Sequence, residues 1–313
     1  MIVGLQNISL KQLRYFVAAA EGGRLSSAAT QMHVSQSTIT TAILNLEETL
    51  QTQLFIRQAH GVILTAEGNR FFLRVRQILD ALEDAVSDPA NAERNLKGRI
   101  RLAASYTLLG YFLPALMGRF RTRHPDVEFD LVDLDRTEIE ASLEAGEIDL
   151  GLVILSNTTL SRQFQHSVLI RSRRQLWAAA GHPLLSQGGT TLADIANYPY
   201  IQITVDEGEL STQRYWQAAG LEPNIAFRTS SMEALRGLIG HGFGVTILSD
   251  MVYRPWSLEG RRIECLPLLD PVPPMEVGLI WQDNNEHADC VETFKQFMID
   301  TCANSSEQFH SAR

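Results

Sequence analysis

The stretch that decides the N-terminal fold is residues 25–47, LSSAATQMHVSQSTITTAILNLE. Small and apolar residues recur at helical spacing on both sides of a short connector, His33-Val34, which predicts two short helices that cross at a tight turn. The side chains of Ala28 and Ala29 are small enough to let the second helix approach the first closely. The inward-facing positions are expected to be Ala28, Ala29, Met32, Ile39, Ala42, Ile43 and Leu46.

The second of these helices has a polar, uncharged first turn. Ser35 is a good N-cap residue, so the helix is expected to begin at Gln36 with free backbone N–H groups and the positive end of its dipole pointing outward. Short hydroxyl and amide side chains can reach base edges or phosphates without filling a DNA groove. The residues predicted to contact DNA are Ser35, Gln36, Ser37, Thr38, Thr40 and Thr41. Taken alone, this pattern also fits an ordinary Ser- and Thr-rich helix start.

The flanking sequence extends the unit to a winged helix–turn–helix. Two short apolar runs, residues 54–57 and 62–65, flank the polar residues Gln58-Ala59-His60-Gly61 and predict a small hairpin, or wing. Arg57 is expected to reach a DNA phosphate, and His60 to lie along the DNA backbone or in the minor groove. A bracing first helix is predicted by Leu10, Leu13, Phe16, Val17 and Ala20.

Short motifs along the chain resemble, in order, those of the LysR-type transcriptional regulators, and the resemblance covers nearly the whole chain. The motifs are Leu13/Phe16, Ala28-Ala29, Ser35-Gln36, Leu46-Glu47, Leu54-Phe55-Ile56-Arg57 and Leu64-Thr65-Ala66-Glu67-Gly68. An ordered set of this kind is more specific than any single motif. The sequence departs from the family pattern at Ser37, where Pro is usual, at Thr40, where Ser is usual, and at Gln51, where Gly commonly ends the recognition helix. These departures bear on base preference rather than on fold.

Charge alone does not predict a DNA-binding head. Residues 1–68 are formally neutral, and the whole chain carries a net charge of -9. Because DNA affinity normally draws on phosphate neutralisation, the chain is not expected to coat nucleic acid non-specifically. A site-specific dimer with few phosphate contacts per subunit remains compatible with both observations.

A single long helix is predicted from residue 67 to residue 86. Its apolar residues Phe71, Val75, Ile78, Leu82 and Ala85 follow the spacing of a coiled-coil seam, which predicts pairing with a second subunit. The alternative is that this side of the helix packs on its own wing. Two recognition helices related by a two-fold axis would require a DNA site made of two related halves.

From Gly98 onward the pattern changes to strands alternating with helices, which predicts parallel α/β units with right-handed crossovers. Strands are expected at residues 99–105, 127–133, 148–154, 175–180, 200–203, 225–228, 245–248 and 275–281, and helices at 111–124, 138–145, 211–219, 232–241 and 290–302. The last strand and helix are expected to return to the first of two lobes, leaving a cleft between them.

The predicted fold class is α/β with an all-α N-terminal part. The expected parts are a winged helix–turn–helix domain at 1–68, a linker helix and hinge at 69–97, an effector domain at 98–304 and a disordered tail at 305–313. Lobe 1 of the effector domain is expected at 98–170 and 272–304, and lobe 2 at 171–271. The resemblance implies that this domain is similar to periplasmic binding proteins and holds a small-molecule effector between its lobes.

Ligands of open α/β sheets bind beyond the carboxyl ends of the strands. The polar residues predicted to bind the effector there are Ser105, Tyr106, Thr107, Asp135, Arg136, Thr137, Gln202, Thr204 and Thr229, although each alone also fits a cap or turn role. Helix N-termini and Arg136 favour a small carboxylate, which is the commonest inducer class in the family that the chain resembles. The acidic residues Asp133, Asp135, Asp206, Glu207 and Glu209 favour instead a cationic or amine-bearing metabolite.

Other functional classes find little support in the sequence. A Gly-x-Ser-x-Gly elbow, a phosphate loop, a His-Glu-x-x-His motif and a Cys-x-x-Cys pair are all missing, so neither an enzyme nor a bound cofactor or metal is expected. The glycine cluster 240–244 follows a helix and fits a helix stop. The second half of the chain also fits a solute-binding protein, but the first residues show no export signal.

The expected location is the cytoplasm, with Cys265, Cys290 and Cys302 as reduced thiols and no membrane contact. The expected partners are double-stranded promoter DNA, a small-molecule effector, further copies of the chain in a homodimer or homotetramer, and RNA polymerase.

Overall fold

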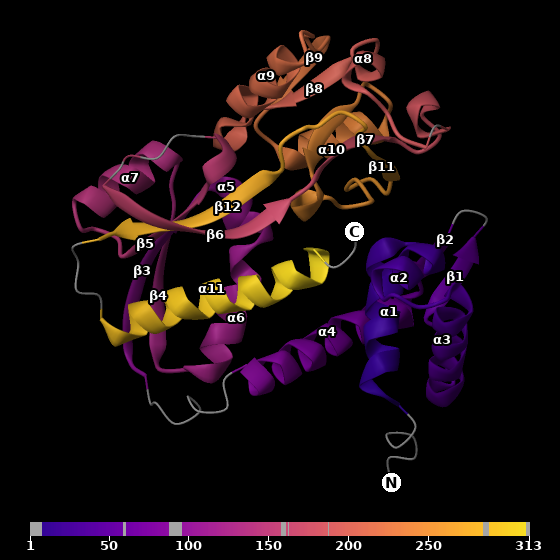
Figure 1. Cartoon of the computed structure of the whole chain (residues 1–313), viewed down its shortest axis with the longest axis horizontal. Helices are drawn as coiled ribbons and strands as arrows, with labels where there is room; N and C mark the ends of the chain where they lie inside the picture. The colour runs from indigo at the N-terminus through magenta and orange to yellow at the C-terminus, as the bar shows by residue number, and fades with distance from the viewer. Residues whose placement is uncertain are drawn as a thin grey trace. The chain divides into compact units, whose positions relative to one another are not determined.

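The computed structural model describes residues 8–58, 61–87, 96–157, 161, 163–186, 188–283 and 288–310. The chain forms two compact units, a head of residues 1–94 and a larger unit of residues 95–309 (Figure 1).

The head is a helical bundle with a two-stranded wing. Its elements are α1 (Leu10–Gly22), α2 (Leu25–Gln31), α3 (Gln36–Leu50), β1 (Phe55–Gln58), β2 (Gly61–Leu64) and α4 (Ala66–Ser87). Phe16 of α1 is fully buried at its centre, together with Ala28, Ile39 and Leu46. The strands β1 and β2 are antiparallel, with Phe55 opposite Leu64 and Gln58 opposite Gly61. The winged helix–turn–helix predicted from residues 10–65 is confirmed.

The family motifs at the end of α3 and after the wing correspond to contacts that join these elements. Glu47 Oε1 accepts hydrogen bonds from the backbone N–H groups of Leu54 and Phe55. Thr65 Oγ1 donates to the Gln53 carbonyl at 2.8 Å and accepts from the Gly68 N–H at 2.8 Å. A Cβ atom on Gly68 would lie 2.1 Å from the Leu54 carbonyl oxygen, so only glycine allows this approach.

The first half of α4 packs on the head itself. Phe71 and Phe72 place their ring centroids 5.2 and 6.4 Å from that of Phe16, and Val75 is 1% exposed in the same core. Ile78, on the seam predicted for subunit pairing, is 52% exposed. The alternative that the sequence left open was packing on the wing; the Phe71–Val75 side does pack within its own head, but against α1 as well as the wing. Ile78 stays exposed in the described part of the chain.

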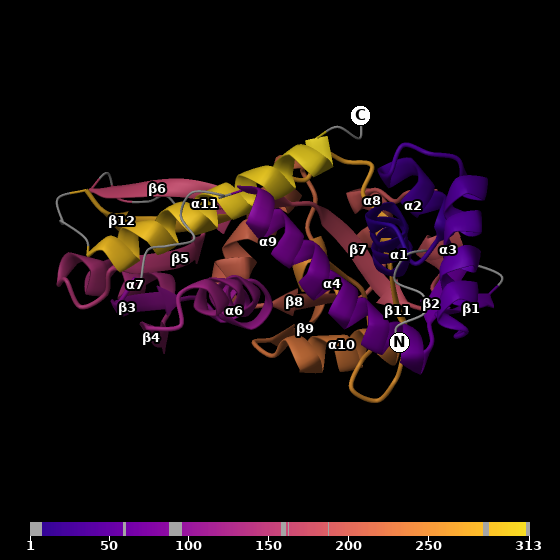
Figure 2. The same ribbon diagram turned by 90° about the horizontal axis from the view of Figure 1, so that it is seen from below.

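Lobe 1 of the larger unit is a five-stranded sheet in the order β4-β3-β5-β12-β6. Its elements are β3 (Gly98–Ala104), α5 (Tyr106–Tyr111), α6 (Leu113–Arg123), β4 (Val127–Asp133), α7 (Arg136–Glu144), β5 (Leu150–Ile154), η2 (Leu155–Asn157), β6 (Phe164–Ser172), β12 (Met275–Gln282) and α11 (Asp289–His310). Helices α6 and α11 cover one face through Phe120 and Phe294, and α7 covers the other through Ile139 and Leu143 (Figure 2).

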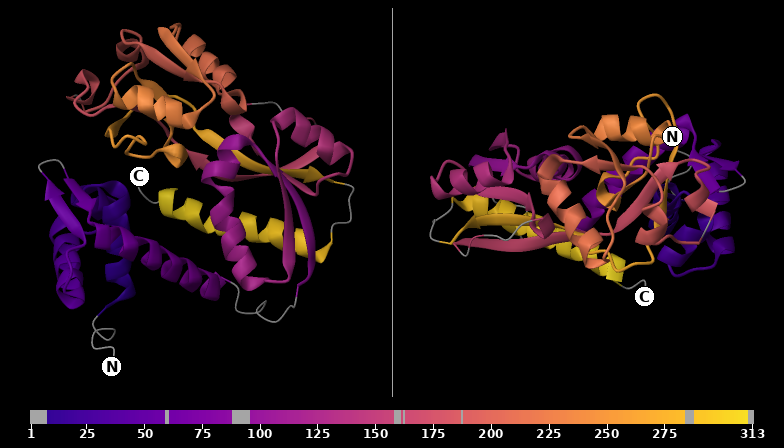
Figure 3. Two further views of the ribbon diagram at one scale, coloured as in Figure 1. Left: turned by 180° about the vertical axis from the view of Figure 1, so that it is seen from behind. Right: turned by 90° about the horizontal axis from the view of Figure 1, so that it is seen from above.

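Lobe 2 contains a three-stranded sheet, β10-β7-β11, and a parallel pair, β8-β9. Its elements are β7 (Arg174–Ala179), η3 (Pro183–Ser186), α8 (Leu192–Ile195), β8 (Tyr200–Ile203), η4 (Val205–Glu207), α9 (Gly208–Ala218), β9 (Ile225–Thr229), α10 (Met232–Gly240), β10 (Thr246–Ser249), η5 (Asp250–Val252) and β11 (Ile263–Pro267). The chain passes between the lobes from β6 to β7 and from β11 to β12 (Figure 3).

Several predicted features of this unit need correction. Strand β12 returns to lobe 1 as expected, but it pairs antiparallel with β5 and β6, and β7 pairs antiparallel with both of its neighbours, so the sheets are not all parallel. The helix expected at 111–124 corresponds to α6, whereas the short helix α5, which precedes it and meets it at Phe112, was not predicted. Strands β6 and β11 were not predicted, because neither shows an apolar alternation. Helix α11 continues to His310, so residues 305–310 extend a helix where a disordered tail was expected.

Candidate nucleic-acid interface and effector cleft

Helix α3 begins as the sequence predicts, with Ser35 as its N-cap. Ser35 Oγ accepts a hydrogen bond from the Thr38 N–H at 3.1 Å and lies 2.7 Å from Ser37 Oγ and 2.8 Å from Thr38 Oγ1. The cap closes the first turn, and three hydroxyl groups gather on it. They provide donors and acceptors for a polar partner.

The predicted DNA-contacting residues are not all equally accessible. Ser35, Gln36, Ser37, Thr38 and Thr41 are exposed, on the side of α3 opposite the buried Ile39, Ile43 and Leu46. Thr40 is half-buried, and its hydroxyl donates to the Gln36 carbonyl at 2.9 Å, so that hydrogen is used within the helix. Arg57 is exposed on β1. His60 lies outside the described residues.

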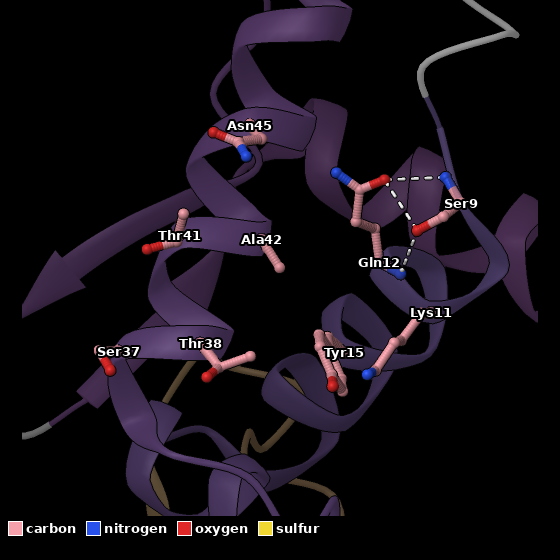
Figure 4. A pocket seen from close by; sticks show the side chains of 9 residues that line it. All are labelled: Ser9, Lys11, Gln12, Tyr15, Ser37, Thr38, Thr41, Ala42 and Asn45. Carbon is pink, nitrogen blue, oxygen red and sulfur yellow. Dashed lines mark hydrogen bonds between the residues drawn. The ribbon is translucent and has the colours of Figure 1, made fainter.

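An open groove of roughly 500 Å³ runs between α1 and the exposed side of α3 (Figure 4). It is lined by Ser9, Lys11, Gln12, Tyr15, Ser37, Thr38, Thr41, Ala42 and Asn45. Thr38 and Thr41 face Lys11 and Tyr15 across it (Figure 4). Of these nine described residues, Lys11 is the one that carries a charge.

Sequence reasoning missed the contribution of α1 to this surface. It treated α1 only as a brace, because the apolar spacing of Leu13, Phe16 and Val17 accounts for the helix without reference to its other side. It therefore did not place the exposed Lys11 beside the recognition helix. Which side of one helix lies beside another depends on packing geometry that a single periodicity does not carry.

The effector residues predicted in lobe 1 fall into two groups. Ser105 is the N-cap residue of α5 and is buried, as is Thr107, whereas Tyr106 is 40% exposed. Asp135 caps α7, because its side chain accepts from the Glu138 N–H at 2.9 Å and from Thr137 Oγ1 at 2.6 Å. Those hydrogen bonds lower the pKa of Asp135, so Asp135 and Thr137 satisfy one another as a helix cap.

Arg136 does not offer an unpaired positive charge. Its Nε donates to Glu207 of lobe 2 at 2.7 Å, and its Nη1 donates to Glu140 at 2.6 Å. Burial lowers the pKa of the guanidinium, but these two carboxylates outweigh burial and raise it. The inference that Arg136 favours an anionic effector is therefore weakened, because its guanidinium is already paired with the carboxylates of Glu140 and Glu207.

The effector residues predicted in lobe 2 are largely engaged within that lobe. Gln202 is 1% exposed and its Nε2 donates to the Ile203 carbonyl at 2.6 Å. The Thr204 N–H donates to the Thr229 carbonyl at 3.0 Å, and Thr229 Oγ1 accepts from the Ser231 N–H at 3.1 Å. Thr204 and Thr229 are half-buried, and Thr204 leads directly into η4.

The segment that reaches lobe 1 is the one after Thr204. Asp206 Oδ2 accepts from the Thr107 N–H at 2.8 Å, and Asn157 Nδ2 donates to the Asp206 carbonyl at 2.5 Å. Arg214 of α9 donates to the carbonyls of Ser156 and Asn157. The sequence identified Asp206 and Glu207 only as acidic loop residues, because their long-range partners leave no local pattern.

The three cysteines are free, and none is activated. Burial is the main cause that raises the pKa of each thiol, to about 11 for Cys265 and to about 12 for Cys302. All three therefore stay protonated at neutral pH. Within the described residues, no helix is long and apolar enough to cross a membrane, and no group of three or more His, Cys, Asp or Glu side chains could hold a metal ion.

Both units match family models. Residues 10–69 match the one described as "Bacterial regulatory helix-turn-helix protein, lysR family", and residues 93–303 match the one described as "LysR substrate binding domain". The chain belongs to the LysR family of transcriptional regulators. The predicted function, a DNA-binding regulator with an effector-binding domain, is confirmed at this level.

Two relatives and one solved structure match over nearly their whole length. The transcriptional regulator YnfL of Escherichia coli (strain K12), described as uncharacterized, is 28% identical over 302 residues, which cover 94% of this chain and 98% of YnfL. The dual regulator GltC of Bacillus subtilis (strain 168) is 28% identical over 296 residues, 93% of this chain and 97% of GltC. The crystal structure of HinK, a LysR family regulator from Pseudomonas aeruginosa, is similar with a TM-score of 0.63 and 26% identity, covering 94% of this chain and 98% of HinK.

Proposed function

We propose that the chain binds an interrupted palindrome in promoter DNA as a homodimer or homotetramer in the cytoplasm, and that a small carboxylate bound between its lobes modulates this activity. The observation that carries the DNA-binding step is the first turn of α3, where the exposed Gln36, Ser37 and Thr38 surround a capped N-terminus. Backbone N–H groups and hydroxyls at a helix N-terminus suit both base edges and phosphates.

Different residues of the head recognise bases and contact phosphates. Gln36 has an amide that can bond an adenine edge in two places, and it is exposed at the first position of α3. Arg57 on the wing and Lys11 in the groove beside α3 supply charge toward the DNA backbone. Few cations per head are consistent with a formally neutral domain that binds a specific site through two copies.

Subunit pairing through α4 is supported by its exposed apolar side chain. Ile78 is 52% exposed although Phe71, Phe72 and Val75 on the same helix pack on the head.

A structure of the similar protein CbnR, 22% identical with a TM-score of 0.56, is described as a complex of full-length CbnR with its target DNA. Contact with RNA polymerase remains part of the proposal and follows from the role of a regulator at a promoter.

The effector is proposed to act by population shift. A ligand that binds one lobe arrangement more tightly than another increases the population of the first arrangement. The size of the shift is limited by the difference between the two affinities. The carboxylate class is supported by the Thr107 N–H and by the buried Ser105 and Thr107 hydroxyls at the start of α5, which both lie against a carboxylate, that of Asp206. The second candidate, an amine-bearing effector, is favoured by the exposed Asp133 near Asp206.

The test combines DNA binding with effector response. Full-length protein is titrated onto its own upstream region in a gel shift at low ionic strength, and metabolite carboxylates and amines are then screened by thermal shift, since a ligand of the native state raises its apparent stability. Ser105→Ala and Thr107→Ala should lose the response to the effector while they keep DNA binding. Failure to bind the promoter region would refute the DNA-binding step, and a normal response in both variants would refute the cleft assignment.

A further inference from the structure

The start of α5 lacks the cap that its sequence leads one to expect. Ser105 occupies the N-cap position with an extended backbone, but its side chain makes no cap hydrogen bond among the described residues. Ser105 Oγ is buried without a hydrogen bond of standard geometry. The second residue of the helix, Thr107, therefore has a backbone N–H that needs an acceptor from elsewhere.

That acceptor comes from the other lobe. Asp206 Oδ2 accepts from the Thr107 N–H at 2.8 Å, across 99 residues of chain. Burial raises the pKa of the Asp206 carboxyl and the nearby charge of Asp133 raises it further, while contacts with Thr107 and Ser105 lower it in part. A carboxylate thus sits at the position where the sequence places a carboxylate effector.

The backbone of the η4 segment, which carries Asp206, directs its acidic side chains toward lobe 1 and does not use them to cap the following helix, α9. Asp206 and Glu207 both adopt the left-handed conformation, with φ of 51° and 58°, which is uncommon for residues other than glycine. Glu207 is the N-cap residue of α9 but makes no side-chain cap bond there, and instead pairs with Arg136 of lobe 1 at 2.7 Å. Both acidic side chains are therefore directed to lobe 1 at a cost in backbone strain and desolvation.

We propose that Asp206 is an internal ligand of the effector cleft, a carboxylate of lobe 2 that occupies the anion position formed by Ser105 and Thr107 and that an effector carboxylate must displace. The inference rests on the proposed function and narrows it to anions with a carboxylate end small enough to replace an aspartate side chain. Strain in the η4 segment favours this exchange, because displacement frees Asp206 and Glu207 from their left-handed conformations. Ligand binding is thereby coupled to the contacts that join the lobes.

The test uses chemical rescue in the full-length chain. Asp206→Ala removes the internal carboxylate, so hydrogen exchange of the Thr107 amide should become roughly ten- to hundredfold faster. Sodium acetate should restore its protection in this variant, whereas acetamide and sodium chloride at equal ionic strength should not. In the wild-type chain, acetate should have little effect on Thr107, since the position is already filled.

Two further variants serve as controls: one tests whether the charge at position 206 matters, and the other whether any lost acid in lobe 2 has the same effect. Asp206→Asn keeps an acceptor oxygen without the charge and should give a smaller increase in exchange, which acetate does not reverse because the amide still fills the position. Glu264→Gln, which loses a surface ion pair with Arg262 elsewhere in lobe 2, should leave Thr107 exchange unchanged. Unchanged Thr107 exchange in both Asp206 variants, or equal rescue by acetamide, would overturn the proposal.

The outcome separates this inference from the function it rests on. DNA binding and effector response are measured on the same preparations. A wild-type response to a carboxylate together with unchanged Thr107 exchange in the variants overturns only the internal ligand. Rescue by acetate in a protein that responds to no carboxylate would instead support the internal ligand and contradict the proposed effector class.

Discussion

Glu47 Oε1 lies 2.7 Å from the Leu54 nitrogen and joins the last turn of α3 to the start of the wing. The same oxygen accepts from the Phe55 N–H at 3.0 Å, so one half-buried carboxylate satisfies two backbone donors where the chain leaves the recognition helix. The relationship fixes the wing, and with it Arg57, relative to the face of α3 that is proposed to read bases.

Removal of this carboxylate should loosen the head. Glu47→Ala leaves two backbone donors without their charged acceptor, which should lower the free energy of unfolding of the head by about 2 to 3 kcal/mol. Glu47→Gln keeps one acceptor oxygen and should lose about 1 kcal/mol. Urea unfolding of the full-length variants, followed by hydrogen exchange of residues 54–64, measures the difference. Wild-type protection in Glu47→Ala would contradict the role assigned to the contact.

The residue that ends α3 should tolerate glycine well. Gln51 has φ 48°, the left-handed conformation that glycine adopts without steric cost at the end of a helix. Gln51→Gly should therefore raise the free energy of unfolding by about 0.5 to 1 kcal/mol, since relief of strain exceeds the entropy that glycine adds to the unfolded chain. Gln51→Ala keeps the strain and should change stability little. A loss of stability in the glycine variant would show that the Gln51 side chain contributes contacts of its own.

The glycine after the wing should not tolerate alanine. A Cβ on Gly68 would meet the Leu54 carbonyl oxygen at 2.1 Å, so Gly68→Ala must separate α4 from the wing junction and should destabilise the head by about 3 kcal/mol or more. Gly118→Ala is the matched control, because a Cβ there has no neighbour within 4 Å and α6 should gain about 1 kcal/mol. Thermal unfolding with DNA binding as a second readout would compare the two, and similar behaviour would rule out a steric cause.

The loss of solvation at one acid of lobe 2, Asp250, predicts a pH effect on stability. Burial raises the pKa of Asp250 from 3.8 to about 6, with Arg173 opposing. Its contribution to stability is complete below about pH 4 and is lost as the pH rises through 6, because the unfolded chain ionises first. Asp250→Asn should flatten this loss and gain about 1 to 2 kcal/mol near pH 7, after an allowance for solvent screening. Parallel stability curves from pH 4 to pH 8 for variant and wild type would contradict it.

The sequence was sufficient to predict those elements that interactions between neighbouring residues determine. Ser35 could be identified as the cap of α3 and residues 127–133 as a strand, because capping chemistry and apolar runs act over a few positions. It was insufficient for the cleft, where the partner of Thr107 is Asp206, 99 residues away, and where Arg136 is paired with Glu207. No local pattern encodes which acids a fold brings to a helix start, so ligand chemistry read from single residues there was incomplete.

Base reading and phosphate holding should separate in two single variants of the head. Gln36→Ala removes an amide from the exposed first position of α3 and should cost about 1 to 3 kcal/mol for the preferred site while weakening other sequences much less. Arg57→Ala removes a charge from the wing and should weaken all sequences alike, with a salt dependence of log K reduced by about one phosphate contact. Fluorescence anisotropy on specific and scrambled duplexes across a salt series resolves the two effects. Equal losses on both duplexes with equal salt slopes would show that Gln36 and Arg57 do not divide the work in this way.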